Sequence, residues 1–272
     1  MSFNVSVIIS TYNQPQWLEK VLFGYEQQSI DSFEIIIADD GSTSETKTLI
    51  EKFKKQSHLK INHVWHEDNG FQKTKILNTS ILASQSDYLI FTDGDCIPRQ
   101  DFIEKHLSLR RKNHFLSGGY FKLPKSISNS ITKNDIVSQD CFNKEWLLNK
   151  GLKKTFKLNK LTASGFKEWF LNTVTPTKAT WDGMNASGWK ENILAVNGFD
   201  ERMQYGGEDR ELGERLMNNK IKAVQIRYSA ICLHLEHSRS YINDESLINN
   251  KKIRLDTKRL KKTWTDYGIL KA

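Results

Sequence analysis

Short apolar runs alternate with segments of helical periodicity in the first half of the chain, and this alternation limits the folds that it can adopt. Each run is rich in β-branched or aromatic residues and too short for a buried helix, which predicts a buried strand. The predicted strands cover residues 5–10, 33–38, 61–65 and 88–92. Since strands that alternate with helices form parallel sheets covered on both faces, we expect an α/β fold with a mostly parallel central sheet flanked by helices.

Polar residues follow three of these predicted strands. They are Thr11-Tyr12-Asn13, Asp39-Asp40-Gly41-Ser42 and Asp93-Gly94-Asp95. In an open α/β sheet the carboxyl ends of the strands converge on one crevice where ligands bind. An aspartate there can hydrogen-bond a base or a ribose hydroxyl, so the crevice suits a nucleotide. The chain has neither a Gly-x-Gly-x-x-Gly sequence nor a P-loop sequence, which argues against a classical dinucleotide fold and a P-loop enzyme.

Asp93 and Asp95 stand one residue apart at the end of the fourth predicted strand. Two carboxylates this close repel each other unless a positive charge lies near them. A hard divalent cation that carries a diphosphate would supply that charge. Asp-Gly-Asp also favours turns, so an ordinary turn is the alternative interpretation.

A second acidic pair, Glu208-Asp209, follows two glycines and precedes a helical apolar pattern that includes Leu212 and Leu216. This order predicts two carboxylates at a helix N-terminus, where the helix dipole favours their ionised form. The glycines would let a ligand approach the backbone. A simple acidic helix cap is the alternative.

His234 and His237 follow alternating apolar residues that predict one strand from Ala223 to Leu233. The spacing suits two metal ligands on a turn, although paired histidines are more often surface residues or hydrogen-bonded core residues.

Together these segments resemble an inverting family 2 glycosyltransferase with the GT-A fold, the fold of nucleotide-diphospho-sugar transferases. The resemblance rests on residues 7–13, 36–42, 70–78 and 91–95. Residues 183–187, 197–200 and 205–212 are similar to the later part of the catalytic domain of β-1,4-galactosyltransferases and bacterial chondroitin polymerases. The resemblance implies a nucleotide-binding half (1–98) and an acceptor-binding, metal-completing half (99–243) in one domain, 1–243.

The resemblance also implies roles for particular residues. A UDP-sugar donor would contact Thr11, Tyr12, Asn13, Asp40, Lys75, Asp93 and Gly94. Mn²⁺ or Mg²⁺ would be bound by Asp95 and His237, with His234 in the place of a methionine of the galactosyltransferases. The acceptor would contact Trp181, Gly207 and Glu208, and Asp209 would be the general base.

These roles imply a single displacement at the anomeric carbon, with inversion of its configuration. A hexosyl or N-acetylhexosaminyl group would pass from the UDP-sugar to a hydroxyl of a glycan or lipid-linked glycan. The lysine-, asparagine- and isoleucine-rich composition indicates an AT-rich bacterial genome. We therefore expect a role in surface polysaccharide synthesis, meaning capsule, O-antigen or lipopolysaccharide.

The resemblance is weakest between residues 120 and 180, where Trp146 and Trp169 precede Trp181 among polar and basic residues. Exposed tryptophans would offer flat faces to sugar rings, whereas buried ones would form a small secondary core.

Residues 244–272 are predicted to form a basic amphipathic helix, with Ile253, Leu260, Trp264 and Tyr267 on one stripe. Such a helix suits an anionic membrane surface. The alternative is a helix packed on the domain with a solvated basic face.

The composition of the chain indicates where the protein is located and which classes of function are less suitable. The chain has three unclustered cysteines, no apolar run of about 20 residues and a first strand that begins without a basic leader, so we expect a cytoplasmic protein, peripheral on the inner membrane face at most. The net charge of +8 would suit a nucleic-acid-binding protein, but that class leaves the acidic strand ends unexplained. A sugar nucleotidyltransferase shares the general fold but requires a glycine-rich phosphate loop that residues 10–13 do not provide. A membrane scaffold without catalysis would be expected to lack a metal-binding or base carboxylate, and none is missing here. We expect no nucleic-acid partner.

Overall fold

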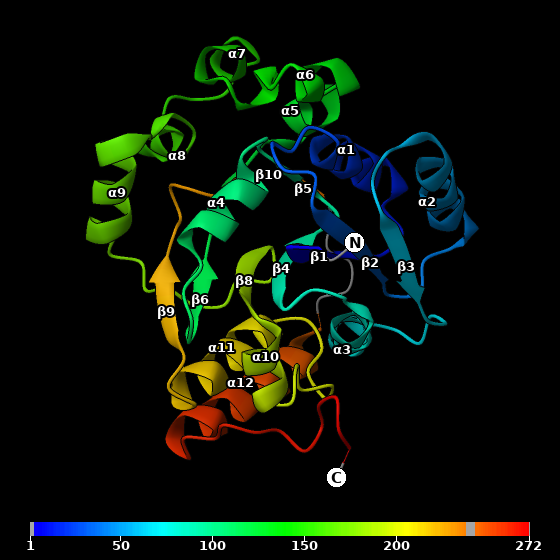
Figure 1. Ribbon diagram of the computed structural model, residues 1–272, viewed down its shortest axis with the longest axis vertical. Helices are drawn as coiled ribbons and strands as arrows, with labels where there is room; N and C mark the ends of the chain where they lie inside the picture. The colour runs from blue at the N-terminus through cyan, green and yellow to red at the C-terminus, as the bar shows by residue number, and fades with distance from the viewer. Residues whose placement is uncertain (1–2, 238–242, 272) are drawn as a thin grey trace.

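The structure is a computed structural model that describes residues 3–237 and 243–271 (Figure 1). Its strands are β1 (Val5–Thr11), β2 (Phe33–Asp39), β3 (Ile61–Trp65), β4 (Tyr88–Asp93), β5 (Cys96–Pro98), β6 (His114–Ser117), β7 (Gly119–Lys122), β8 (Asn185–Trp189), β9 (Lys222–Gln225) and β10 (Ile231–His234). The main helices are α1 (Pro15–Tyr25), α2 (Ser44–Gln56), α3 (Lys73–Ala83), α4 (Phe102–Leu109), α9 (Gly165–Val174), α10 (Lys190–Ala195), α11 (Glu208–Asn218) and α12 (Asp244–Arg259). Shorter helices lie between α4 and α9, namely α5 (Lys125–Ser130), α6 (Lys133–Val137), η1 (Asp140–Phe142), α7 (Lys144–Asn149), η2 (Phe156–Leu158) and α8 (Asn159–Thr162).

Within the described residues, the main sheet has seven strands in the order β3-β2-β1-β4-β8-β6-β9. Strands β3, β2, β1 and β4 run parallel, and β8 is antiparallel to both of its neighbours. The mostly parallel sheet predicted from the sequence is therefore confirmed. In this sheet Ser10 pairs with Asp93 and Thr11 with Asp39, so the three polar strand ends lie side by side.

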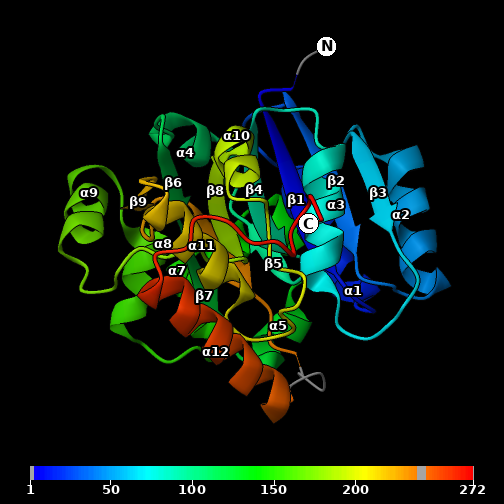
Figure 2. The same ribbon diagram turned by 90° about the horizontal axis from the view of Figure 1, so that it is seen from below.

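Helices cover both faces of the sheet, so β1 buries its side chains on both sides. Val5, Val7 and Ile9 pack in the core formed with α1, α2 and α4. Ile8 packs in a second core with α3, α10 and α11. Figures 1 and 2 show these two helical layers on opposite sides of the strands. Burial on both faces explains why the strand is continuously apolar.

The sequence between Ala223 and Leu233 forms two strands, so the prediction of one strand is wrong. β9 pairs with β6 in the main sheet, and β10 pairs with β7 in the three-stranded sheet β5-β10-β7. Strands β6 and β7 are consecutive in the chain but belong to different sheets. Their partners β9 and β10 are also consecutive, so the chain passes from one sheet to the other between β9 and β10 as well. A turn makes this step, with the Ser229 N–H donating to the Ile226 carbonyl at 2.9 Å.

The C-terminal helix also ends earlier than predicted, because α12 stops at Arg259. Lys261 has a φ of 52°, in the left-handed region. The Lys262 N–H donates to the Thr257 carbonyl at 3.1 Å and the Lys261 N–H to the Lys258 carbonyl at 3.4 Å, the bonds of a Schellman motif. Trp264 and Tyr267 therefore lie beyond the helix.

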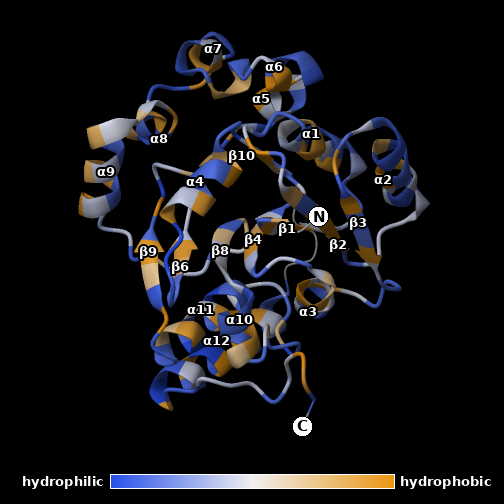
Figure 3. Cartoon of the chain, viewed as in Figure 1, coloured by the Kyte–Doolittle hydropathy of each residue, from blue (hydrophilic) through white to orange (hydrophobic). Residues whose placement is uncertain are grey.

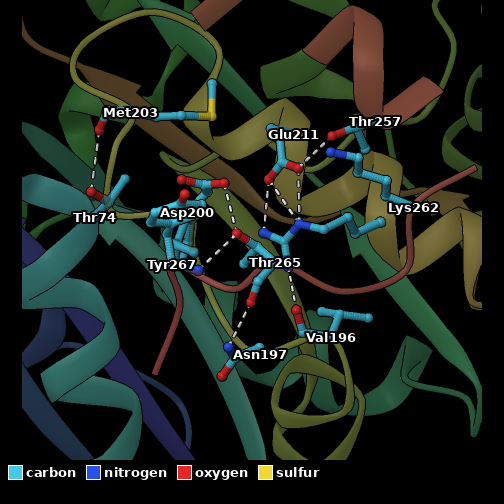
Figure 4. A network of polar contacts seen from close by, with 12 residues as sticks. Thr74, Val196, Asn197, Asp200, Met203, Glu211, Thr257, Lys262, Thr265 and Tyr267 are labelled. Carbon is cyan, nitrogen blue, oxygen red and sulfur yellow. Dashed lines mark hydrogen bonds and ion pairs between the residues drawn. The ribbon is translucent and has the colours of Figure 1, made fainter. Parts of the chain in front are cut away.

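The segment after α12 packs back onto the domain. The Thr265 hydroxyl donates to Asp200 at 2.7 Å, and the Asn197 side chain donates to the Thr265 carbonyl at 2.7 Å (Figure 4). In the same network Glu211 of α11 accepts a bond from Thr257 of α12 at 2.8 Å. Helix α12 thus packs against α11, which agrees with the alternative that the sequence left open.

Candidate active site

A cavity of about 850 Å³ opens at the carboxyl ends of β1, β2 and β4. Residues from both halves of the chain line it. Of the residues predicted for the site, it collects Thr11, Tyr12, Asn13, Asp40, Asp93, Gly94, Asp95, Trp181, Gly207, Glu208, Asp209, His234 and His237. Chain segments far apart in sequence thus meet in one place, as expected for ligands that bind outside the strand ends.

Asp40 is held in position by two hydrogen bonds. His66 Nε2 lies 2.8 Å from Asp40 Oδ1, and the Gln72 N–H donates to Asp40 Oδ2 at 3.0 Å. Burial raises the pKa of Asp40, although the bonds to His66 and Gln72 act in the opposite direction. The carboxylate therefore has a fixed orientation at this wall of the cavity.

Asn13 joins the ends of β1 and β2. Its φ is 47°, and its side-chain oxygen accepts a bond from the Thr43 N–H at 2.9 Å. Its own N–H donates to the Ser42 hydroxyl at 2.9 Å. The neighbouring Tyr12 donates to Asp68 at 2.9 Å and keeps an exposed ring in the cavity wall. This turn can present a flat ring and a polar backbone to a base.

Asp93 Oδ1 accepts bonds from the Ser10 hydroxyl at 2.5 Å and from Lys73 Nζ at 2.7 Å. Burial alone would lower the pKa of Lys73, but the negative charges of Asp93 and Glu208 outweigh it and raise that pKa. Lys73 therefore stays cationic beside the acidic groups.

The sequence assigned this position to Lys75, and the structure corrects that assignment. Lys75 is exposed and does not line the cavity, whereas Lys73 does. Two residues apart on a helix, the two side chains point about 200° apart.

Gly94 lets the strand ends approach each other closely. A Cβ at this position would lie 3.0 Å from Thr11 Oγ1, and the Gly94 N–H donates to the Ser10 carbonyl at 2.7 Å. Within the described residues, Thr11 Oγ1 is buried without a hydrogen-bond partner.

Asp95, His234 and His237 form a cluster whose ligand atoms all lie within 4.8 Å of one another. Asp95 Oδ2 is 2.7 Å from His237 Nε2 and 3.6 Å from His234 Nε2. Burial opposes ionisation, but the bond from His237 and the charges of both histidines lower the pKa of Asp95. Strand β10 creates the cluster, because it pairs with β5 and the Leu235 N–H donates to the Asp95 carbonyl at 2.9 Å.

The same cluster fits a divalent cation by the chemistry of its donors. It offers one carboxylate oxygen and two imidazole nitrogens, a mixed set that Mn²⁺ accepts. Among the described residues, the buried His234 Nδ1 has no hydrogen-bond partner. Ser238 and Arg239, which continue the galactosyltransferase-like sequence, lie outside the described residues.

Helix α11 begins at Glu208, as the sequence predicts. Gly206 and Gly207 precede it with φ values of 111° and 95°, a region that favours glycine. A Cβ on Gly206 would also lie 2.3 Å from the Leu247 side chain. The two glycines thus set the direction from which the acidic pair enters the cavity.

The two acids of this pair have different surroundings. Asp209 accepts bonds from the N–H groups of Gly183 at 3.0 Å and Arg210 at 2.6 Å. Glu208 accepts a bond from the Gly206 N–H at 2.8 Å. Burial and the nearby charge of Asp209 raise the pKa of Glu208 to about 7.

Asp182 belongs to the same wall and was not predicted. Burial and the charges of Asp209 and Asp93 raise the pKa of Asp182 to about 7. Its position before Gly183 gave the only sequence signal, the same acid-glycine pattern as in Asp93-Gly94. Among the described lining residues, six are carboxylates and three are lysine or arginine, so the cavity favours a cation or a cation-bound anion.

Trp181 does not present a ring face to the cavity, contrary to its predicted role. The residue is fully buried, and its ring centroid lies 5.3 Å from that of Phe91 and 5.5 Å from that of Phe115. It belongs to the core beneath α11, because Gly213 leaves room for its backbone. The alternative of a core tryptophan is correct here, whereas Trp169 is exposed.

Comparison with family models decides the identity of the domain. The model described as "Glycosyl transferase family 2" matches residues 6–166. The chain belongs to glycosyltransferase family 2. A second model, described as "N-terminal domain of galactosyltransferase", matches residues 177–238, the part that holds the acidic pair and both histidines. Both parts of the family resemblance expected from the sequence are confirmed.

Characterised relatives agree with this family. The chain is 27% identical over 239 residues to a chondroitin synthase of Pasteurella multocida, which covers 79% of the chain and 23% of that protein. It is 24% identical over 243 residues to a validoxylamine A glucosyltransferase of Streptomyces hygroscopicus, covering 83% of the chain and 54% of that protein. The chain thus spans less than two thirds of either relative.

Solved structures confirm the GT-A fold. Staphylococcus aureus TarS (residues 1–349) in complex with UDP-GlcNAc matches with a TM-score of 0.62 and 15% identity, covering 96% of this chain and 69% of that one. A Pyrobaculum calidifontis mannosyltransferase in complex with GDP-Man and Mn²⁺ matches with a TM-score of 0.59 and 18% identity, covering 96% and 63%.

Proposed function

We propose that this glycosyltransferase is an inverting, metal-dependent enzyme that transfers a hexosyl or N-acetylhexosaminyl group from a UDP-sugar. The acceptor would be a hydroxyl of a glycan or lipid-linked glycan. One observation carries the proposal: the nucleotide-side strand ends, the Asp95–His234–His237 cluster and the acidic pair of α11 all line one cavity.

Asp95, His234 and His237 would hold Mn²⁺ or Mg²⁺. When bound, the cation would neutralise charge on the diphosphate leaving group. The donor set supports this assignment, since a carboxylate and two imidazoles lie within 4.8 Å of one another at the end of β4.

Asp209 is the proposed general base. The Gly183 N–H holds one carboxylate oxygen at 3.0 Å, which fixes the direction of the carboxylate in the cavity. A base held in this way can accept the acceptor proton as the hydroxyl attacks the anomeric carbon. Glu208, with a pKa of about 7, is partly protonated at neutral pH and can hydrogen-bond the same hydroxyl in either form. A single displacement of this kind inverts the anomeric configuration.

The nucleotide would lie against the other wall. Tyr12 offers an exposed ring and Asp40 a fixed carboxylate, which suit a base and a ribose. Lys73 places a cation beside Asp93, where the phosphates would lie. UDP is favoured over GDP by the UDP-GlcNAc complex of TarS, although the mannosyltransferase complex contains GDP-Man.

The relatives favour polysaccharide synthesis as the setting. A chondroitin synthase and a poly(ribitol-phosphate) β-N-acetylglucosaminyltransferase are both similar to this chain. We place the enzyme in bacterial surface polysaccharide synthesis, at the cytoplasmic face of the membrane.

A donor panel tests the proposal. UDP release would be measured with a set of UDP-hexoses and UDP-N-acetylhexosamines, with matched GDP-sugars, in the presence of Mn²⁺ and after its removal by EDTA. We expect release from one UDP-sugar class that stops with EDTA and returns with Mn²⁺ or Mg²⁺. Release that persists in EDTA, or that occurs only with GDP-sugars, would contradict the metal or the donor assignment.

A further inference from the structure

Helix α9 exposes an apolar stripe to solvent. Phe166, Trp169, Phe170 and Val174 are 76%, 59%, 46% and 51% exposed. They recur at the three- and four-residue spacing that places side chains on one face of a helix. The Phe166 ring lies 5.5 Å from Trp169 and 6.3 Å from Phe170, centroid to centroid, so these side chains form one continuous patch.

The opposite face of α9 is polar and anchors the helix to the domain. Glu168 pairs with Lys105 of α4 at 3.0 Å. The Asn172 side chain donates to the Ser229 hydroxyl at 2.8 Å and accepts from the Tyr228 N–H at 2.9 Å. This is the reverse of an ordinary surface helix, whose apolar face points to the core. Protein contacts therefore fix the orientation in which the aromatic residues face outward.

The sequence on either side of the stripe is basic. Residues 151–180 contain six lysines and one acidic residue, Glu168, whose charge is already paired with Lys105. The exposed lysines of this segment are Lys153, Lys154, Lys157, Lys167 and Lys178. Figures 1 and 2 show α9 at the edge of the molecule with α8 beside it, and Figure 3 shows hydrophobic residues along α9.

We propose that α9 and the lysines around it form a docking surface for an anionic lipid membrane. Aromatic side chains on one face of a helix, with lysines around them, match the apolar core boundary and the anionic headgroups of a bilayer at once. A contiguous exposed apolar patch of this kind marks an interaction site. In the described residues no helix is both long and apolar enough to span a bilayer.

The surface lies close to the active site. Thr180 lines the cavity, and only residues 175–179 separate it from the end of α9, a span of at most about 20 Å. Lys160 of α8 donates to the carbonyl of Tyr120, another lining residue, at 2.7 Å. The inference builds on the proposed function here, since a membrane on α9 would place a lipid-linked acceptor near the cavity.

Helix α12, the membrane-binding segment expected from the sequence, offers a matched control. Its exposed apolar residues within the helix include Ile248 and Leu255. Two of its basic residues are already committed, because Arg254 and Lys258 both pair with Glu214 of α11. Both helices lie in basic segments of the chain, but α9 carries exposed aromatic residues and α12 contains none.

Vesicle flotation tests whether the α9 surface binds an anionic membrane. The full chain would be mixed with vesicles of phosphatidylglycerol and phosphatidylcholine, or of phosphatidylcholine alone. We expect the wild type to float only with the anionic vesicles. The triple variant Phe166→Ser, Trp169→Ser, Phe170→Ser should bind at least about tenfold more weakly, because each aromatic residue loses its buried apolar area. The control Ile248→Ser, Leu255→Ser should float like the wild type.

The lysines give an independent test. Replacing Lys153, Lys154 and Lys157 by glutamine should weaken binding to anionic vesicles by about 100-fold, since each lysine near a charged surface contributes about fivefold. Raising the salt concentration should weaken wild-type binding by a larger factor than the residual binding of this variant, which keeps Lys167 and Lys178.

Two results would overturn the surface. One is equal flotation of the α9 triple variant and the wild type. The other is that the wild type does not float while a soluble anionic polysaccharide changes Trp169 fluorescence, which would assign the patch to a glycan.

UDP binding in the presence of Mn²⁺, measured by calorimetry, separates the membrane surface from the proposed function. A protein that floats but does not bind UDP contradicts the proposed function alone. A protein that binds UDP but does not float contradicts the membrane surface alone.

Discussion

The two walls of the cavity differ in how their charges are paired. On the nucleotide side, Asp40 is bonded to His66 and to the Gln72 N–H, and Asp93 to Ser10 and Lys73. These side chains are already oriented by their neighbours.

On the wall that holds Asp182 and the acidic pair of α11, the acids crowd one another instead. Asp182 and Glu208 both have a pKa raised to about 7, by burial and by the charge of Asp209. The bonds that Asp209 receives come from backbone N–H groups. Perturbed carboxylates of this kind gather where chemistry occurs. This difference supports the proposal that the nucleotide binds at the first wall and that the reaction takes place at the second.

The variant Asp209→Asn tests the difference between the two walls most directly. We expect kcat for sugar transfer to fall about 100- to 10,000-fold, because the amide cannot accept the acceptor proton. The Kd for UDP should change less than about twofold, since UDP would lie on the other wall. UDP release and calorimetry measure the two quantities. Transfer near the wild-type rate would show that the base lies elsewhere.

The metal dependence of sugar transfer should change when the cluster of Asp95, His234 and His237 is altered. His237→Ala removes one of three donors around Asp95. We expect the Mn²⁺ concentration for half-maximal activity to rise at least about tenfold, since even loss of a residue that supports a ligand costs that much. A titration of activity against Mn²⁺ checks this. His114→Ala, at a histidine outside the cavity, is the control and should leave the titration unchanged.

The nucleotide wall can be tested with two lysines of the same helix. Lys73→Met removes the cation bonded to Asp93, and kcat/KM for the donor should fall about tenfold or more because a partly buried carboxylate loses its charged partner. Lys75→Met changes an exposed residue outside the cavity and should have no effect. Steady-state kinetics measure both. Equal effects of the two changes would return the role to Lys75.

The smallest effect expected is on stability. The pKa of Glu208 is raised to about 7, so its protonated form favours folding below the ordinary pKa near 4.5, and this contribution is lost as the pH rises through about 7. Glu208→Gln cannot lose a proton. Relative to wild type, the variant should therefore gain up to about 3 kcal/mol between pH 4.5 and pH 8, an upper limit from the pKa shift.

Melting temperatures at the two pH values measure this gain. The difference between variant and wild type should grow with pH by roughly 5 °C or more. Glu45→Gln, an exposed acid in the first turn of α2, is the control. A difference that is independent of pH would contradict the acidic crowding of the second wall.

Local patterns were sufficient where burial and chain direction follow from a few neighbouring residues. The four strands of the first half lie within one residue of their predicted bounds, for example β1 at Val5–Thr11 and β4 at Tyr88–Asp93. A continuous apolar run is buried because its exposure to water is unfavourable, and the polar residues at its end mark the edge of the sheet. The acidic pair after Gly206-Gly207 was located for the same reason.

Errors occurred where the outcome depended on a distant partner. The step from β9 to β10 follows the step from β6 to β7, more than 100 residues earlier in the chain. Helix α12 ends at a left-handed Lys261, where the usual glycine signal is missing. Trp181 is buried because Phe91 and Phe115 pack around it, and its own sequence gives no sign of them.

By itself, therefore, the sequence determined the positions of the four strands of the first half, the acidic strand ends and the family resemblance, because each depends on residues close together in the chain. Only the tertiary structure decided which lysine meets Asp93, that Asp182 joins the acidic wall, and that α9 turns its aromatic face outward. These depend on the phase of a helix against its neighbours. That phase is set by packing and hydrogen bonds between segments far apart in sequence, such as Glu168 with Lys105.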